Sequence, residues 1–321
     1  MKRIPVLVPP AAEQSAIVRF LDHADGRIKR FIAGKRRLIQ LLNEQKQAII
    51  QKAVTRGLDP NVRFKPSGVG WLGYIPEHWD LAPLKRTCNL IRDGTHQPPP
   101  RTQSGFPLLS VRNIITEELV RRPDDSFISE ADYYALCRSF VPEAHDVLLA
   151  IVGATLGKVA IVPEMLPFQI QRSLAALRPA PDQLDYRFLA SYLRSAGFQS
   201  ALWQTVAFSA QPGIYLGTIA TFPIPLPHFN EQVAIALFVA DRVKAIDRAI
   251  TAVRGQVDLI REYRSQLIAD VATGKLDVRG VEVPPMDDAE DLPALGDETI
   301  DKATEEESEL EPGEGSADAA D

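Results

Sequence analysis

The chain has 321 residues, of which 45% are hydrophobic and 24% are charged, so it can bury the core of one large domain or two ordinary ones. Its formal net charge is -6, but the charge is unevenly distributed. Residues 281–321 hold sixteen acids and one base, a net -15, whereas residues 1–280 carry a net +9. The acidic total therefore does not exclude a polyanionic ligand, and the basic body favours one.

Cysteine, histidine and hydropathy exclude several classes of protein. Two cysteines, Cys88 and Cys137, cannot build a disulfide framework or a cysteine-rich zinc site. The five histidines are scattered without the spacing of metal ligands. Prolines interrupt the only apolar run near the N-terminus, and no apolar run reaches the length of a membrane span. We expect a soluble, cytoplasmic protein without a metal site.

An internal repeat dominates the sequence. Residues 4–59 align without a gap on residues 222–277, with 17 identities in 56 positions. Each copy opens with an apolar segment punctuated by prolines, followed by a Glu-Gln pair and a long periodic run without proline. We predict a strand within residues 1–10 and two long helices, over 11–57 and 228–276.

The periodic runs show the spacing of a coiled coil, because their apolar residues alternate between steps of four and three. The predicted seam consists of Ile17, Leu21, Ile28, Leu38, Leu42 and Ile49 in the first helix, and Ile235, Val239, Ile246, Val253, Ile260 and Leu267 in the second. One helix enters and the other leaves the segment between them, so a pair would be antiparallel. About 45 helical residues form a rod of roughly 65–70 Å. The alternative is that both are core helices of one domain.

The segment between the helices, residues 58–227, has the pattern of a mixed α/β domain. Short apolar runs at 107–111, 146–152, 159–162 and 175–177 predict strands. Helical spacing predicts one helix over 184–200. The acidic residues 281–321 have too little apolar content to fold, so we expect a disordered tail.

No motif in the chain predicts catalysis. Residues 68–73 match G-x-G-x-x-G, but no strand precedes them and no helix follows, as a dinucleotide site requires. Residues 153–158 are one residue short of a phosphate-binding loop. No metal cluster or catalytic constellation accompanies either motif. We expect a protein that is not an enzyme and binds no cofactor.

Polar side chains on glycine- and proline-rich loops of the middle domain are suited to DNA recognition. Arginine and glutamine can contact base edges, and threonine, asparagine and lysine can hold phosphates. The candidates are Arg92, Thr95, His96, Gln97, Arg101, Arg112, Asn113, Lys158, Gln171 and Arg172. Their concentration in 92–113 makes that segment the first candidate reader, with 169–172 as the next. The alternative for each is a solvated surface loop.

Several segments, in order and spacing, resemble the specificity subunit of type I restriction-modification systems. They are Gly-Trp-Leu-Gly-Tyr-Ile-Pro-Glu-His-Trp at 70–79, Asp-Gly-Thr-His at 93–96, Ser-Val-Arg-Asn-Ile at 110–114, residues 145–162, and Pro-Leu-Pro at 225–227. The resemblance covers residues 4–280. It implies a target-recognition domain that reads a short half-site in double-stranded DNA and is mounted on a helical spacer.

The resemblance also implies partners. Methylation and cleavage would belong to separate modification and restriction subunits, which would bind S-adenosylmethionine, ATP and Mg. Members of the family usually carry two recognition domains, so residues 1–10 would be a remnant strand closing a first domain that is missing here. A homodimer of half-subunits and a truncated frame both remain open. A different class also stays open: a coiled-coil scaffold whose middle domain binds protein or a small ligand.

Overall fold

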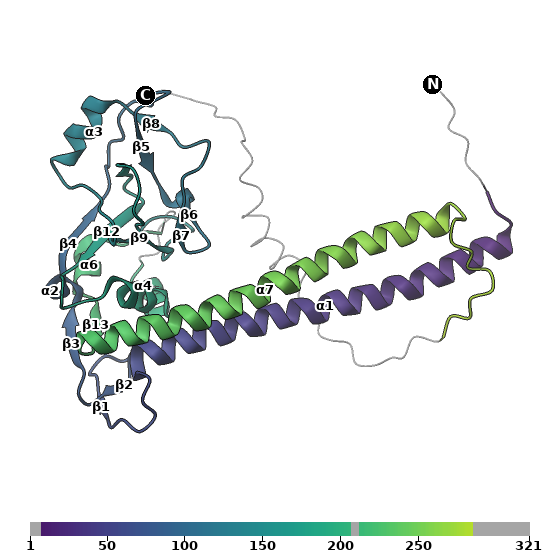
Figure 1. Cartoon of the computed structure of the whole chain (residues 1–321), viewed down its shortest axis with the longest axis horizontal. Helices are drawn as coiled ribbons and strands as arrows, with labels where there is room; N and C mark the ends of the chain where they lie inside the picture. The colour runs from purple at the N-terminus through teal and green to yellow at the C-terminus, as the bar shows by residue number, and fades with distance from the viewer. Residues whose placement is uncertain (1–7, 207–211, 285–321) are drawn as a thin grey trace. The chain divides into compact units, whose positions relative to one another are not determined.

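The computed structural model describes residues 8–206 and 212–284, and the chain forms two compact units (Figure 1). One unit comprises residues 45–244. The other combines the segments before residue 45 and after residue 244. Most of the strand predicted within residues 1–10 and nearly all of the predicted acidic tail lie outside the described residues. In the described part of the chain, no helix is long and apolar enough to span a membrane.

Two long helices correspond to the repeated segments. They are α1 (Ala11–Arg56) and α7 (Phe229–Ala272). Each has a glutamate of the Glu-Gln pair in its first turn, where a negative charge stabilises the helix dipole. Gly57, with φ of 71°, follows α1 and donates its N–H to Ala53 O, which is a glycine cap that ends the helix.

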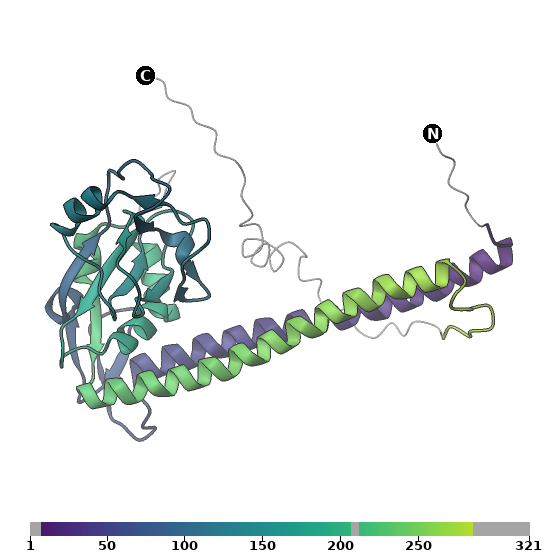
Figure 2. The same cartoon turned by 45° about the horizontal axis from the view of Figure 1, so that its top comes forward.

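In the second unit, residues 11–44 of α1 and 245–272 of α7 lie side by side in both views (Figure 1, Figure 2). Arg264 of α7 forms an ion pair with Asp25 of α1. Apolar residues from both helices line a hollow beside this ion pair, among them Ile28 and Leu267. The two repeats therefore contact one another within this unit.

The buried stripe of α1 differs from the predicted seam in its second half. Leu38, predicted in the seam, is 40% exposed, while its neighbour Ile39 is 7% exposed and Ile50 is 1% exposed. Ile28, Ile39 and Ile50 are separated by eleven residues, a period of 3.67 residues per turn. A strict heptad pattern drifts away from the contact face of a helix with 3.6 residues per turn, and this drift explains the error at Leu38.

A six-stranded sheet forms the centre of the 45–244 unit. Its strand order is β4 (Cys88–Asp93), β12 (Leu174–Pro179), β9 (Val147–Ala150), β10 (Val159–Ile161), β7 (Glu118–Leu119) and β6 (Ile114–Ile115). Neighbours are antiparallel except β10 and β7. Side chains of β9 and β12 alternate between two hydrophobic clusters, one on each face of the sheet. The strands predicted in 146–152, 159–162 and 175–177 are thus present.

Smaller elements cover the sheet. A three-stranded sheet of β11 (Gln169–Ile170), β5 (Phe106–Leu109) and β8 (Phe127–Ile128) adjoins α3 (Glu130–Cys137). The other short elements are β1 (Phe64–Pro66), β2 (Tyr74–Pro76), β3 (Asp80–Pro83), α2 (Leu84–Thr87), η1 (Val111–Asn113), α6 (Leu216–Thr221) and β13 (Pro223–Leu226). The domain therefore mixes helix and sheet, as the sequence predicts.

The single helix predicted over 184–200 is two helices, α4 (Tyr186–Arg194) and α5 (Ala196–Gln204). Ser195 separates them with extended backbone angles, φ -67° and ψ 143°. Its hydroxyl accepts a hydrogen bond from the backbone N–H of Phe198, so this serine is the N-cap of α5. Apolar periodicity continues through the break because both helices bury a face in the same core.

The first turn of α7 is held by the domain through the Glu-Gln pair. Glu231 accepts a hydrogen bond from the indole Nε1 of Trp79 at 3.0 Å and contacts His78 Nε2 at 2.9 Å. Gln232, fully buried, accepts from the backbone N–H of Asp185 and donates to the carbonyl of Pro227. The ends of both long helices therefore share the core of the domain.

Candidate DNA-binding interface

The ends of four neighbouring strands bring several candidate side chains together. These ends lie on one side of the central sheet, which is called its edge below. Strands β4 and β9 end at this edge, whereas β12 and β10, which are antiparallel to them, begin there. Arg92 lies at the end of β4, Arg172 just before β12, and Lys158 just before β10. Because neighbouring strands are about 4.8 Å apart, the edge from β4 to β10 spans roughly 14 Å.

The segment after β4 is joined to the segment before β12 by backbone hydrogen bonds. Thr95 N–H donates to Ile170 O at 3.0 Å, and Arg172 N–H donates to Thr95 O at 3.1 Å. Gly94 is required at this approach, because a Cβ there would lie 2.1 Å from Ile170 O. Residues 94–97 and 170–172 therefore form one structure.

The segment after β5 is also bonded to residues 170–172. Gln171 N–H donates to Leu109 O at 2.9 Å, and β11 runs parallel to β5. Arg112 lies three residues beyond Leu109, in η1. We call residues 92–97, 109–112 and 170–172, together with Lys158 on the neighbouring hairpin, the loop surface. The two candidate readers of the sequence analysis are thus parts of one surface.

Exposure differs among the candidates on the loop surface. Thr95 and Gln171 are partly buried, and the hydroxyl of Thr95 donates to Gln97 O at 2.9 Å. His96 Nε2 lies 2.6 Å from a carboxylate oxygen of Asp93. These contacts shape the turn. The exposed candidates are Arg92, His96, Gln97, Lys158 and Arg172.

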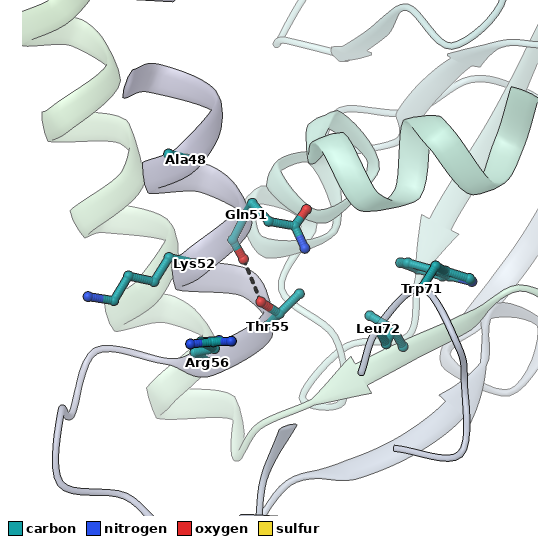
Figure 3. Close-up of a pocket in the computed structure, with 7 residues that line it drawn as sticks. All are labelled: Ala48, Gln51, Lys52, Thr55, Arg56, Trp71 and Leu72. Carbon is teal, nitrogen blue, oxygen red and sulfur yellow. Dashed lines mark hydrogen bonds between the residues drawn. The ribbon is translucent and has the colours of Figure 1, made fainter. Parts of the chain in front are cut away.

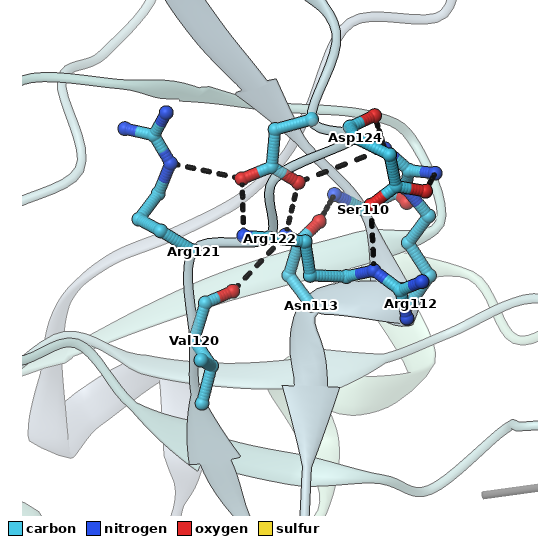
Figure 4. A network of polar contacts seen from close by, with 8 residues as sticks. Ser110, Arg112, Asn113, Val120, Arg121, Arg122 and Asp124 are labelled. Atoms are coloured by element: carbon cyan, nitrogen blue, oxygen red, sulfur yellow. Dashed lines mark hydrogen bonds and ion pairs between the residues drawn. The ribbon is translucent and has the colours of Figure 1, made fainter. Parts of the chain in front are cut away.

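Asn113, proposed from the sequence as a DNA contact, has an internal role. Its side chain is buried, at 1% exposure. The amide Nδ2 donates to Asp125 Oδ1 at 2.7 Å and to Val120 O at 3.1 Å, while Oδ1 accepts from Ser110 N–H at 3.0 Å (Figure 4). These bonds use both donors of the amide. Asn113 therefore shapes the loop and does not face a ligand.

Arg112 lies close enough to Arg101 for its charge to act on the Arg101 guanidinium. Arg112 is ion-paired with the carboxylate of Asp124 at 3.0 Å and donates to the Asp124 carbonyl at 2.6 Å. Partial burial and, second, the charge of Arg112 lower the pKa of the Arg101 guanidinium. Positive charge is therefore concentrated beside the loop surface.

Asp124 and Asp125, which bind Arg112, Arg121 and Arg122, were not predicted from the sequence as part of the site. Asp125 is buried and binds Arg121 Nε and the backbone N–H of Arg122, both at 2.9 Å (Figure 4). The available signal was the run Arg-Arg-Pro-Asp-Asp at 121–125, where two bases and two acids on either side of a proline indicate a loop that forms its own ion pairs.

An open hollow of about 520 Å³ lies elsewhere on the domain, at the last turns of α1 (Figure 3). Its lining residues are Ala48, Gln51, Lys52, Thr55, Arg56, Trp71 and Leu72. Gln51 Oε1 accepts from Gly197 N–H at 2.7 Å, so this side chain ties α1 to α5. The lining includes no acid and no activated nucleophile. Within residues 8–206 and 212–284, no cluster of histidine, cysteine and carboxylates could hold a metal ion.

Comparisons with known proteins show which proteins the chain is similar to. Residues 110–253 match the family described as type I restriction modification DNA specificity domain. The type I restriction enzyme MjaVIII specificity subunit of Methanocaldococcus jannaschii is 26% identical over 288 residues, which cover 87% of this chain and 64% of that protein. The EcoBI specificity subunit of Escherichia coli is 29% identical over 278 residues, 82% of this chain and 58% of that protein.

The fold is also similar to a solved structure. One chain, from work on complex assembly and conformational transition of the type I R-M system, superposes with a TM-score of 0.61 at 20% identity, covering 84% of this chain and 62% of that one. The present chain spans about three fifths of the length of the curated relatives it matches. The domain match and the relatives together show that the chain is similar to the specificity subunits of type I restriction-modification systems.

Proposed function

We propose that the chain is the DNA-reading subunit of a type I restriction-modification complex and that it recognises a short half-site with residues 58–227. The observation that carries this proposal is the loop surface, where three segments distant in sequence are joined by backbone hydrogen bonds at one edge of the sheet. A rigid backbone with exposed arginine, glutamine and lysine side chains suits base-edge and phosphate contacts. The chain itself is non-catalytic.

Within the loop surface we assign different tasks to different side chains. Gln97 and Arg172 are exposed and lie on joined segments, so we propose them as base readers. Arg92, Arg101 and Lys158 would contact phosphates, which fix the register of the domain on the duplex. Thr95, His96 and Gln171 hold the turn and would contribute through its shape.

We further propose that α1 and α7 pair as an antiparallel coiled-coil spacer to which the modification subunits, and through them the restriction subunit, dock. The ion pair between Asp25 and Arg264 and the apolar residues around it support the pairing. S-adenosylmethionine, ATP and Mg are expected on those partner subunits. The cytoplasm is the compartment where such a complex meets DNA.

The repeat also gives the spacer two equivalent ends. Glu231 and Gln232 hold the domain, and Glu13 and Gln14 occupy the same positions in the first copy. Type I specificity subunits usually read two half-sites. We propose that this chain reaches two recognition domains per complex as a homodimer.

The test is methylation by the chain co-expressed with its modification subunit. Replacing Gln97 or Arg172 by alanine should relax the methylated motif at one position and cost roughly 1–3 kcal/mol of binding. The matched control is Arg86→Ala, an exposed arginine near the opposite end of β4. If both variants methylate the parent motif as stringently as the control does, the loop surface is not the reader. DNA binding that does not weaken with salt would instead support the scaffold.

A further inference from the structure

Asp124 and Asp125 are adjacent in sequence but lie in opposite environments. The side chain of Asp125 is 2% exposed, whereas that of Asp124 is 47% exposed. Asp125 accepts hydrogen bonds from Asn113 Nδ2, Arg121 Nε and the backbone N–H of Arg122, at 2.7–2.9 Å. A buried carboxylate with three donors is a permanent part of the fold, because removing any donor would leave a buried charge short of partners.

Asp124 is bound in a different way. One of its carboxylate oxygens accepts from Arg112 Nη1 and the other from Arg122 Nε, each at 3.0 Å (Figure 4). The exposed carboxylate thus bridges two guanidinium groups. The hydrogen bond from Arg122, together with the positive charges of Arg112 and Arg122, lowers the pKa of Asp124, which keeps the carboxylate ionised.

Four arginines lie around Asp124 and Asp125. Arg112, Arg121 and Arg122 are each bound to one of these carboxylates, and Arg101 lies close enough to Arg112 for its pKa to be lowered. An anion placed between Arg112 and Arg122 would therefore still find attractive charge. Guanidinium groups bind phosphate oxygens more strongly than most other donors do, because two parallel N–H bonds can form.

We propose that Asp124 occupies a phosphate-binding site: its carboxylate takes the place of a DNA backbone phosphate between Arg112 and Arg122 and is displaced when DNA binds. This inference rests on the proposed DNA-reading function and adds a regulatory element to it. Water solvates Asp124 and Arg112 when they separate, because their side chains are 47% and 36% exposed. The side chain of Arg122 is only 12% exposed, so the incoming phosphate must replace the carboxylate as its partner. Asp125 keeps Arg121, Arg122 and the loop in place during the exchange.

The consequence is a lower affinity for DNA of unrelated sequence. A phosphate must compete with the carboxylate, so contact with the backbone alone yields less affinity than the arginines could supply. Binding then depends more on the base contacts of Gln97 and Arg172 on the neighbouring loops. Asp124 would thus lower the affinity for every duplex, and stable occupancy of a site would require base contacts as well.

The experiment measures the affinity of the full chain for a target duplex and an unrelated duplex across a salt series. Asp124→Asn should tighten both by roughly 3- to 10-fold at low salt and steepen the slope of log K against log salt by about 1. The matched control is Glu164→Gln, which removes the same charge from an exposed acid beyond the opposite end of β10. If Asp124→Asn and Glu164→Gln gained equally in DNA affinity, the proposal would be overturned.

A second set of variants separates this inference from the proposed function. Combining Arg112→Ala with Asp124→Asn should abolish the gain in DNA affinity that Asp124→Asn produces alone. Combining Arg86→Ala with Asp124→Asn should leave that gain in place. If Asp124→Asn behaves as the parent while Gln97→Ala still changes the motif, the phosphate site fails and the reading function stands. If the parent shows no salt-dependent binding, the function itself fails. The melting temperature of Asp124→Asn should stay near that of the parent, since its side chain is exposed.

Discussion

Asn113 and Gln97 have similar amide side chains, yet their surroundings assign them different tasks. The amide of Asn113 is buried between Asp125 and the backbone of Ser110, whereas that of Gln97 is exposed. Burial obliges an amide to satisfy its own hydrogen bonds inside the protein. Exposure leaves it able to bond to a ligand.

This contrast predicts a crossed pattern of effects. Asn113→Ala would leave the carboxylate of Asp125 and the N–H of Ser110 short of partners, so it should lower the free energy of unfolding by about 1–3 kcal/mol. Gln97→Ala should change that free energy by less than about 0.5 kcal/mol but alter DNA affinity. Urea unfolding and DNA titration of both variants check the pattern. A stable Asn113→Ala protein with altered DNA affinity would contradict it.

Cys88 illustrates the effect of burial on a thiol. Desolvation raises its pKa to about 12, and a weaker hydrogen bond with Thr87 acts in the other direction. The reactive thiolate is therefore scarce at neutral pH.

In a Cys137→Ala background, Cys88 should react with iodoacetamide at pH 8 far more slowly than the same thiol in urea. The rate should rise tenfold per pH unit until the thiol titrates, because the thiolate fraction rises in that proportion. Mass spectrometry of timed samples measures both rates. Equal labelling in folded and unfolded protein would show that the thiol is accessible.

At the scale of elements, the helices show how a one-residue shift changes the buried face. Leu38 and Ile39 are neighbours of similar size, but only Ile39 is buried. The second copy of the repeat buries the equivalent residue. Val257, which corresponds to Ile39 at the offset of 218, is 6% exposed. The two copies thus share this buried position, whereas Ile268, the equivalent of Ile50, is 41% exposed.

Ile39→Asp should therefore lower the free energy of unfolding by several kcal/mol, because it buries a charge without a partner. Leu38→Asp, the matched control, should cost less than about 1 kcal/mol. Thermal melts followed by helical circular dichroism measure the difference. If Leu38→Asp were the more damaging change, the heptad seam predicted from the sequence would hold after all.

At the scale of the whole molecule, the proposed function depends on the charge of the chain and on the number of copies in the complex. Residues 1–280 carry a net +9 and form the basic body, so phosphate attraction should bring many sequences to it. Specificity must then come from the few base contacts of the loop surface and from the number of recognition domains in the complex.

The homodimer proposal predicts a defined stoichiometry. Light scattering of the complex on a duplex carrying two half-sites should give two chains per duplex, whereas a duplex with one half-site should bind more weakly. The physical reason is that the second domain binds at high effective concentration once the first is anchored. One chain per two-site duplex, with undiminished affinity, would exclude the homodimer.

The sequence by itself determined the local elements of this protein. The repeat, the long helices and the core strands follow from periodicity, and periodicity depends on residues close together in the chain. The candidate loops also followed from composition, since arginine, glutamine and glycine in a short segment suit recognition.

Only the tertiary structure decided how those elements are used. Long-range strand pairing joined 94–97, 109–112 and 170–172 into one surface, and no local pattern encodes which strands become neighbours. Burial then separated Asn113 from Gln97, Asp125 from Asp124 and Ile39 from Leu38. Each pair is alike in chemistry, so the difference comes from packing, which depends on residues far away in the chain.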